Sequence, residues 1–364
     1  MRFRGRINAC IAGVVAAVVL AAPAPAHATS SEFRASYDAS VPLEAHVAIE
    51  RALTHWSALV STPVPVVVAV HWGDLPPLVA AASDHLRLVR AAPDGDLEPV
   101  ALADALSGRD LRDGRPDVSI TFSTRERWQF DPDTPAPPGY VDLETFALHE
   151  IGHGLGLFAS FHDAGDGQVA WGRFGDDGSG FGAVAMDRFL VDGRSGAPLL
   201  DKSAFPSPSA ALRVAVTSGA VVWGGPARDA GGRRIRIESR SQWNYHCSLA
   251  HLAEVAYSPG SPDALMTTTI RRGETIHQVG PAALGILHDL GWTVHLDADT
   301  PPPPPPPPLP APPVAVVAPV AVTLPSPTPA NPPTQTAAAD DASREVFGLG
   351  VVVAFAFGFR RRLR

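Results

Sequence analysis

An unbroken run of eight prolines, residues 301–308, limits what this chain of 364 residues can fold into. Proline fixes φ and has no backbone N–H group, so such a run adopts an extended polyproline II conformation and cannot build a hydrophobic core. Proline, alanine and threonine dominate until about residue 339. We therefore interpret residues 299–345 as a semi-rigid linker and expect the folded part to precede it.

The N-terminus has the parts of a secretory signal peptide. Arginines within the first six residues form a basic start, an apolar stretch covers residues 9–22, and an Ala-x-Ala site ends at Ala28. The apolar stretch is shorter than the roughly 20 residues of a membrane-spanning helix. We predict that residues 1–28 are removed on export, and we interpret residues 29–298 as the folded domain of a secreted or cell-surface protein.

The cysteine content and the net charge limit how the fold can be stabilised and which partners it can bind. Cys10 lies in the signal peptide, so the mature chain keeps Cys247 alone and cannot form an internal disulfide. An exported fold of this kind must be held by its core or by a metal ion. The formal net charge is −8 and no stripe of lysine or arginine is visible, so we predict no nucleic-acid partner.

The pattern of residues 29–298 predicts an α+β fold with a mixed sheet, in one large domain or two lobes. Apolar residues recur at helical spacing over residues 43–60, and residues 64–72 and 117–123 have the composition of strands. A short helix is predicted for residues 281–290, with proline at its start and glycine just beyond. Residues 128–140 and 160–182 are rich in proline, glycine or aspartate and are predicted to be loops.

One further predicted helix, between Asp142 and Gly156, contains candidate metal-binding and catalytic residues. Asp142 is a plausible N-cap, and Gly154 and Gly156 would end the helix. His149 and His153 lie one turn apart on one face, where both imidazoles can reach one zinc ion. Glu150 can hold the attacking water and take its proton as general base. The alternative is two histidines on a helix surface.

Chance gives His-Glu-x-x-His in roughly one or two of a hundred chains of this composition, so the motif alone is only suggestive. Its position in a predicted helix of an exported protein makes a zinc site more specific. A catalytic zinc also needs a third protein ligand. The candidates are His251, His162 and His246, the last beside Cys247, whose thiolate is also a zinc ligand type.

The segment from His149 to Gly156 resembles the signature of metzincin zinc metallopeptidases. The usual third histidine would fall at Ala159, so the chain departs from the common pattern. It is similar instead to the leishmanolysin-like branch, in which a long insertion precedes the third histidine and a Met-turn follows it. His251 and Met266 have this spacing, and residues 280–292 resemble the closing helix of that branch.

This resemblance covers about residues 43–292. It implies a metzincin-like zincin fold with an irregular C-terminal subdomain, zinc held by His149, His153 and His251, and Met266 as a floor beneath them. The implied activity is that of a monomeric zinc endopeptidase acting on a protein or peptide substrate. The alternatives are a non-catalytic, zinc-stabilised surface or adhesion module, and a metallohydrolase of another substrate class.

Further residues have weaker assignments. Tyr245 and Tyr257 are candidates for oxyanion support, and the strand at residues 118–122 is expected to bind substrate backbone by strand addition. Four aspartates could ligate calcium, although a solvated loop is the favoured interpretation: Asp163, Asp166, Asp176 and Asp177.

The C-terminal residues 346–364 resemble the sorting tails of bacterial surface proteins. Residues 346–359 are apolar or glycine, and a basic cluster follows at once. A short apolar helix here is marginal for spanning a bilayer. We predict transient membrane attachment through this tail and then its cleavage between Ala337 and Gly350.

Overall fold

A computed structural model describes residues 31–76, 81–83, 88–90, 95–176, 178, 180–244, 247–295 and 350–352. The predicted signal peptide and linker lie outside the described residues. Within these ranges the chain forms five α-helices and several small sheets, a mixed architecture compatible with the predicted α+β class.

The largest sheet has four strands in the order β1-β3-β7-β4, namely Phe33–Tyr37, Val66–Gly73, Val118–Ser123 and Ala81–Ser83. β1, β3 and β7 are parallel and β4 is antiparallel to β7, which confirms the predicted mixed sheet. β7 therefore pairs on both sides. The prediction that β7 binds substrate by strand addition is wrong, because β4 occupies the outer edge.

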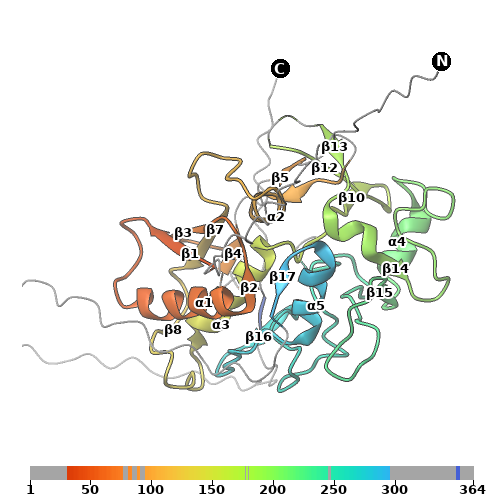
Figure 1. Cartoon of the computed structure of the whole chain (residues 1–364). Helices are drawn as coiled ribbons and strands as arrows, with labels where there is room; N and C mark the ends of the chain where they lie inside the picture. The colour runs from red at the N-terminus through yellow and green to blue at the C-terminus, as the bar shows by residue number, and fades with distance from the viewer. Residues whose placement is uncertain are drawn as a thin grey trace, which may run out of the picture.

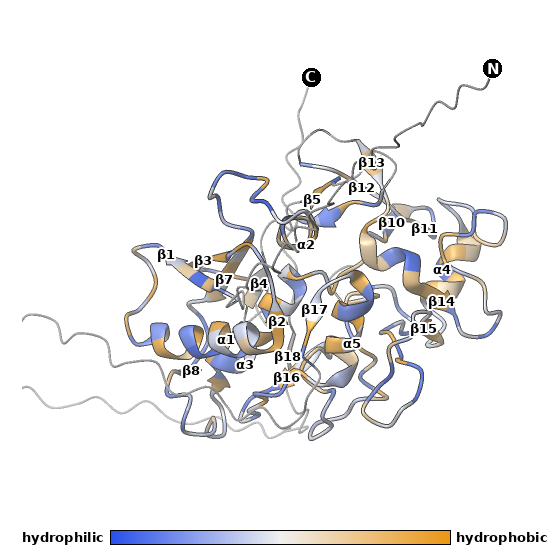
Figure 2. Ribbon diagram, in the orientation of Figure 1, coloured by the Kyte–Doolittle hydropathy of each residue, from blue (hydrophilic) through white to orange (hydrophobic). Residues whose placement is uncertain are grey.

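Two helices pack against this sheet and against each other: α1 (Ala45–Leu59) and α3 (Leu143–Gly154). α1 buries Ala48, Ile49, Ala52, Leu53 and Trp56 along one side, and Figure 2 shows hydrophobic and hydrophilic residues on different sides of this helix. The Trp56 indole N–H donates to the carbonyl of Leu148 at 3.2 Å. The helix predicted over residues 43–60 is thus confirmed, and it packs against the middle of α3.

The remaining elements are short. In Figure 1 the four-stranded sheet with α1 and α3 lies on the left, and most elements from β10 onward lie on the right. The short elements are β2 (Val60–Ser61), β5 (Leu88–Val89), β6 (Glu98–Pro99), α2 (Val100–Ser107), β8 (Trp128–Gln129), β9 (Val141–Asp142), β10 (His162–Gly165), β11 (Gln168–Ala170), β12 (Arg173–Phe174), β13 (Phe181–Gly182), the 3₁₀ helix Ala185–Phe189, β14 (Leu190–Asp192), α4 (Ala210–Val216), β15 (Val221–Trp223), β16 (Thr269–Arg271), α5 (Pro281–Leu290) and β17 (Thr293–Val294).

One difference from the sequence-based expectations concerns residues 160–182. Residues 160–182, predicted to be a loop, contain the hairpins β10–β11 and β12–β13. These strands have two to four residues each, too short for a period of two to show in the sequence. The predicted helix 281–290 is confirmed as α5, and its carboxyl end turns at Gly291, which has φ +117°.

One main hydrophobic core runs through the described chain, from Phe33 to Trp292. The carboxyl end of this core lies against the end of α3, because the Trp292 indole donates to the carbonyl of Leu155 at 2.9 Å. Side chains of both halves therefore pack around α3, and its histidines lie inside the core.

The C-terminal apolar run is described only at β18 (Gly350–Val352), which pairs antiparallel with β16. These three residues are strand rather than the short apolar helix that we expected, and the rest of the run lies outside the described residues. No helix within the described ranges has the length and apolar composition needed to cross a membrane.

Candidate metal centre

α3 begins as the sequence predicts. The Asp142 carboxylate accepts a hydrogen bond from the backbone N–H of Thr145 at 2.8 Å, which satisfies one of the free amides of the first turn. Every residue of α3 is buried, including Glu144, His149, Glu150 and His153. The sheet, α1 and the second half of the chain surround the helix, so its polar side chains face protein and not solvent.

Glycines end α3 and allow its close packing. The backbone N–H of Gly156 donates to the carbonyl of His153, and that of Leu157 donates to Gly152, with Gly156 at φ +127°. These are the two bonds of a Schellman motif, in which glycine is favoured at the turn position. A Cβ at Gly154 would lie 2.5 Å from the Val118 side chain, so this residue lets α3 approach β7. The chain then turns back, and Leu157 comes to lie beside His153.

The third histidine arrives from a distant part of the chain. The carbonyl of His251 accepts from the Glu238 N–H, and the next residue, Leu252, donates to the carbonyl of Met266, both at 2.8 Å. Residues 264–267 form a tight turn, because Thr267 N–H donates to the Ala264 carbonyl at 3.1 Å. We call residues 264–267 the Met266 turn. The backbone of the His251 segment is thereby tied to this turn.

Three buried imidazoles converge. One nitrogen atom from each of His149, His153 and His251 lies within 4.8 Å of the others, a group that could hold a metal ion. The ring centroids are 4.6 to 5.3 Å apart, and each residue is at most 2 % exposed. The structure therefore brings together the histidines that the resemblance implied, and it favours His251 over His162.

Backbone carbonyls determine which nitrogen of each ring faces the centre. Nδ1 of His149 is 2.7 Å from the Leu265 oxygen, that of His153 is 2.6 Å from the Leu157 oxygen, and that of His251 is 3.1 Å from the Cys247 oxygen. A carbonyl oxygen only accepts, so each Nδ1 must carry the proton and donate. In a neutral ring, Nε2 then has the lone pair, which is the form that ligates metal.

The Nε2 atoms of His149 and His153 approach each other to 2.9 Å. Two lone pairs at this distance repel unless a cation lies between them. Burial lowers the pKa of His149 to about 4 and that of His153 well below its usual value, so a proton is a poor candidate at neutral pH. Burial, followed by the charge of His149, lowers the pKa of His251 to about 3. The arrangement suits a metal ion bound to neutral imidazoles.

Met266 lies directly against the ligand helix. A Cβ built on Gly152 would be 2.9 Å from the Met266 sulfur and 3.2 Å from its methyl carbon. Gly152 immediately precedes His153, so only glycine lets the methionine approach here. The carbonyl before Met266 is the one that orients His149. The Met266 turn thus supports the histidines through packing and through a hydrogen bond.

The rival ligands are placed elsewhere or are not described. His162 begins β10, and its Nδ1 is 3.2 Å from the Ser160 carbonyl oxygen; it is not part of the histidine group. His246 lies outside the described residues, as does Tyr245. Cys247 is a buried free thiol whose pKa burial raises to about 11, which disfavours the thiolate that a metal needs.

The structure changes one further sequence-based assignment, that of Tyr257, and it places two of the four aspartates in other contacts. The Tyr257 hydroxyl accepts from the Arg236 N–H at 3.1 Å and donates to Asp229 at 3.4 Å, so it stabilises a loop rather than an oxyanion. Asp163 binds Arg213, and Asp176 accepts from the Leu88 N–H. These aspartates form no group suited to an ion within the described residues, and Asp177 lies outside them.

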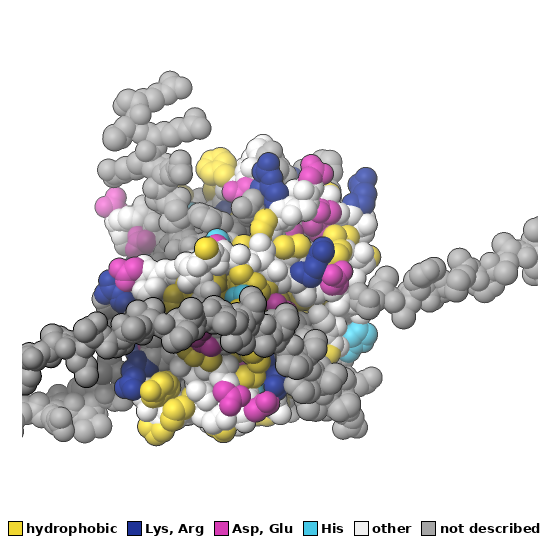
Figure 3. Space-filling model, turned by 90° about the vertical axis from the view of Figure 1, so that its left-hand side faces the viewer, with side chains coloured by type: hydrophobic (Ala, Val, Ile, Leu, Met, Phe, Trp, Pro, Cys, Tyr) yellow, Lys and Arg dark blue, Asp and Glu magenta, His cyan; other side chains and the backbone are white. Residues whose placement is uncertain are grey.

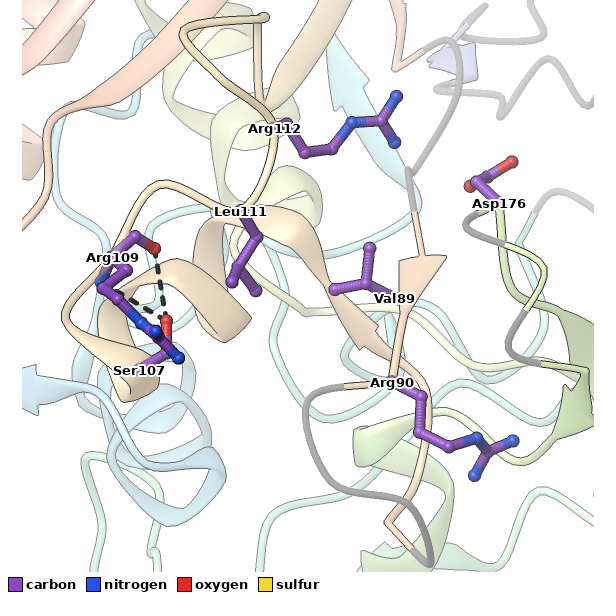
Figure 4. A pocket seen from close by; sticks show the side chains of 7 residues that line it. All are labelled: Val89, Arg90, Ser107, Arg109, Leu111, Arg112 and Asp176. Carbon is purple, nitrogen blue, oxygen red and sulfur yellow. Dashed lines mark hydrogen bonds between the residues drawn. The ribbon is translucent and has the colours of Figure 1, made fainter.

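A separate cavity of about 360 Å³ is lined by residues that include three arginines: Val89, Arg90, Ser107, Arg109, Leu111, Arg112 and Asp176. Figure 4 shows that the three guanidinium groups do not converge on one point, and Arg112 points toward Asp176. This arrangement does not form an anion site. On the face drawn in Figure 3, acidic and basic side chains are interspersed without a patch of one sign.

Comparison of the chain with protein-family models, with curated proteins and with solved structures finds no match. The histidine centre, whose donor set and tautomers fit a metal ion, is therefore the feature of the molecule that points to a function.

Proposed function

We propose that this protein is an exported zinc-dependent endopeptidase with a metzincin-like catalytic domain. The observation that carries the proposal is the 2.9 Å approach of two Nε2 atoms whose rings both donate through Nδ1. A zinc ion held by His149 and His153 would remove the repulsion between these two lone pairs. Three neutral imidazoles are also the ligand set of a catalytic zinc with an open fourth position.

The metal, when bound, would act as a Lewis acid that activates water. His149, His153 and His251 would hold it through Nε2. Glu150 follows His149 on α3 and is fully buried. We assign it the role of general base, which takes a proton from the attacking water and returns it to the leaving amine. A purely structural zinc site has closed coordination and no need of such a carboxylate, which argues against the adhesion-module alternative.

The edge of the sheet offers a place for an extended peptide. β4 is the outer strand, it pairs only with β7 in the described sheet, and it contacts α3. A peptide that pairs with β4 would run along the ligand helix, with backbone hydrogen bonds that do not depend on its side chains. This assignment replaces the one that we made for β7 from the sequence.

Replacing Glu150 by glutamine tests the reaction. Glu150→Gln should leave zinc occupancy and the unfolding midpoint near those of the native protein, and lower casein hydrolysis by at least about 100-fold, since general-base catalysis contributes that much. Activity is measured with and without a chelator, and zinc by elemental analysis. Glu44→Gln is the matched control, because Glu44 is exposed just before α1.

The outcomes separate the alternatives. If Glu150→Gln cleaves casein as fast as the native protein, Glu150 does not activate water. If the native, zinc-loaded protein cleaves neither casein nor gelatin, the adhesion module or a non-peptide substrate is favoured.

A further inference from the structure

Titratable side chains surround the first turn of α3, and they do not include the three histidines of the centre. They come from α1, from the loop before β9, from α3 and from the segment before α5: Arg51, His55, Asp133, Asp142, Glu144 and His277. Asp142 and Glu144 are each 1 % exposed. Buried carboxylates of this kind are costly unless they have partners.

His277 bridges the two carboxylates. Its Nε2 atom is 2.9 Å from Asp142 Oδ1 and 3.6 Å from Glu144 Oε2. The other side of Glu144 faces His55, whose Nδ1 is 3.3 Å from Oε1. Asp142 Oδ1 also accepts from the Thr145 N–H and hydroxyl. In this geometry the imidazole of His277 donates to the N-cap of the helix that carries the metal ligands.

The segment formed by residues 265–277 contacts α3 at two places, the first turn of this helix and the turns that carry His149 and His153. Near its end, the Ile276 N–H donates to the Thr145 hydroxyl at 2.8 Å, and His277 binds Asp142. At its start, the Leu265 carbonyl accepts from His149, and Met266 packs on Gly152. Residues 265–277 therefore hold the first turn and the ligand turns of α3 together.

We propose that His277 is a positioning residue whose protonated ring fastens the first turn of α3 to the chain leaving the Met266 turn, and so keeps His149 and His153 in register with the carbonyl and methionine that support them. The inference rests on the metal centre and does not require peptidase activity.

Electrostatics supports a charged His277. Burial lowers its pKa, but the hydrogen bond to Asp142 and the charges of Asp142 and Glu144 outweigh burial and raise the pKa above its usual value. Burial, then the charge of His277, lowers the pKa of His55 to about 4, so His55 stays neutral. Arg51 is bound to Asp133 at 2.8 Å. Burial raises the pKa of Glu144 to about 7.

The contribution of His277 to stability decreases as pH rises. His277 has a higher pKa in the folded state than in the unfolded state, so its contribution is complete below the unfolded value of about 6.5. The contribution is lost as pH rises through the folded-state pKa. Ionisation of Glu144 between its unfolded pKa and about 7 also disfavours the folded state as pH rises. The attachment is therefore strongest in mildly acidic solution.

The test compares His277→Gln with the native chain by chelator competition for zinc. Glutamine can still donate to Asp142 but does not titrate. At about pH 6 the variant should bind zinc at least about threefold more weakly, because it lacks the charged hydrogen bond to Asp142 that holds the first turn of the helix with two of the histidines. At about pH 9 the two dissociation constants should agree within about twofold. His288→Gln is the matched control, since His288 is an exposed histidine on α5.

A direct titration complements the affinities. The ring resonances of His277 in the metal-free protein should titrate above about 6.5, and Glu144→Gln should lower that pKa because it removes one of the two facing charges. A pKa at or below 6.5, or an affinity ratio that is the same at every pH, would overturn the proposal. A zinc-binding protein that fails to cleave casein contradicts the proposed function alone, since neither measurement here depends on turnover.

Discussion

Three backbone carbonyls select the tautomer of the three histidines of the centre. Those of Leu265, Leu157 and Cys247 each accept from an Nδ1 atom, and each belongs to a segment held by other hydrogen bonds. Partners of this kind fix the orientation of the ring and raise its strength as a ligand. Since the partners are backbone atoms, side-chain replacement at these positions should leave the tautomers unchanged.

Cys247 and His251 give a sharp contrast at this scale. His251→Ala removes an Nε2 ligand and should reduce zinc from about one ion per chain to a small fraction after dialysis. Cys247→Ser keeps the carbonyl that orients His251 and should retain about one ion, because the thiol is buried, protonated and not part of the histidine group. Elemental analysis of both proteins decides this, with His162→Ala as control. Full occupancy in the His251 variant would move the third ligand to another residue.

At the scale of the element, α3 combines helix signals with glycines that a helix normally disfavours. Gly152 makes room for Met266, Gly154 for Val118, and Gly156 for the turn at φ +127°. The helix is therefore specified by what it packs against as much as by its own propensity. Its intrinsic weakness is offset by the buried contacts on every side.

Gly152→Ala tests the contact with the Met266 turn. The added Cβ would lie 2.9 Å from the methionine sulfur, and overpacking of this size costs about 1–3 kcal/mol of stability. Denaturant unfolding measures the loss, and zinc affinity should fall with it. The double variant Gly152→Ala/Met266→Ala should lose less than the sum of the single variants, because the truncated side chain makes room. Strict additivity would show that the two residues do not interact.

Local sequence patterns predicted the three longest helices and the two histidines of the centre that lie on α3. α1, α3 and α5 have apolar periodicity or end signals, and the four-residue spacing of His149 and His153 is a property of one helix. α2 and the hairpins β10–β11 and β12–β13 are too short to give such a pattern. His251 needed the family resemblance. The attachment of His277 to Asp142 joins residues far apart in sequence, and no spacing rule indicates it.

At the scale of the molecule, the centre joins two halves of the chain. His149 and His153 belong to the part with the main sheet, and His251 belongs to the irregular part that follows. The main core runs through both parts, and Trp292 closes it against the end of α3. A metal ion bound to all three histidines would therefore stabilise the association of the two halves, in addition to any chemistry it performs.

Both ends of the chain are predicted to be removed from the mature protein. We expect mass spectrometry of the mature protein from its native host to show an N-terminus at Thr29 and a C-terminus between Ala337 and Gly350. This expectation is based on the basic start, apolar stretch and Ala-x-Ala site at the N-terminus, and on the linker, apolar run and arginine cluster at the C-terminus.

Cleavage between Ala337 and Gly350 would remove β18 and free the edge of β16 with which it pairs. Backbone amides of β16 should then exchange hydrogen faster in the mature protein than in the full-length chain, while those of β3 and β7, paired on both sides, should not change. Recovery of an intact Arg364 terminus in a soluble fraction would contradict the sorting-tail hypothesis.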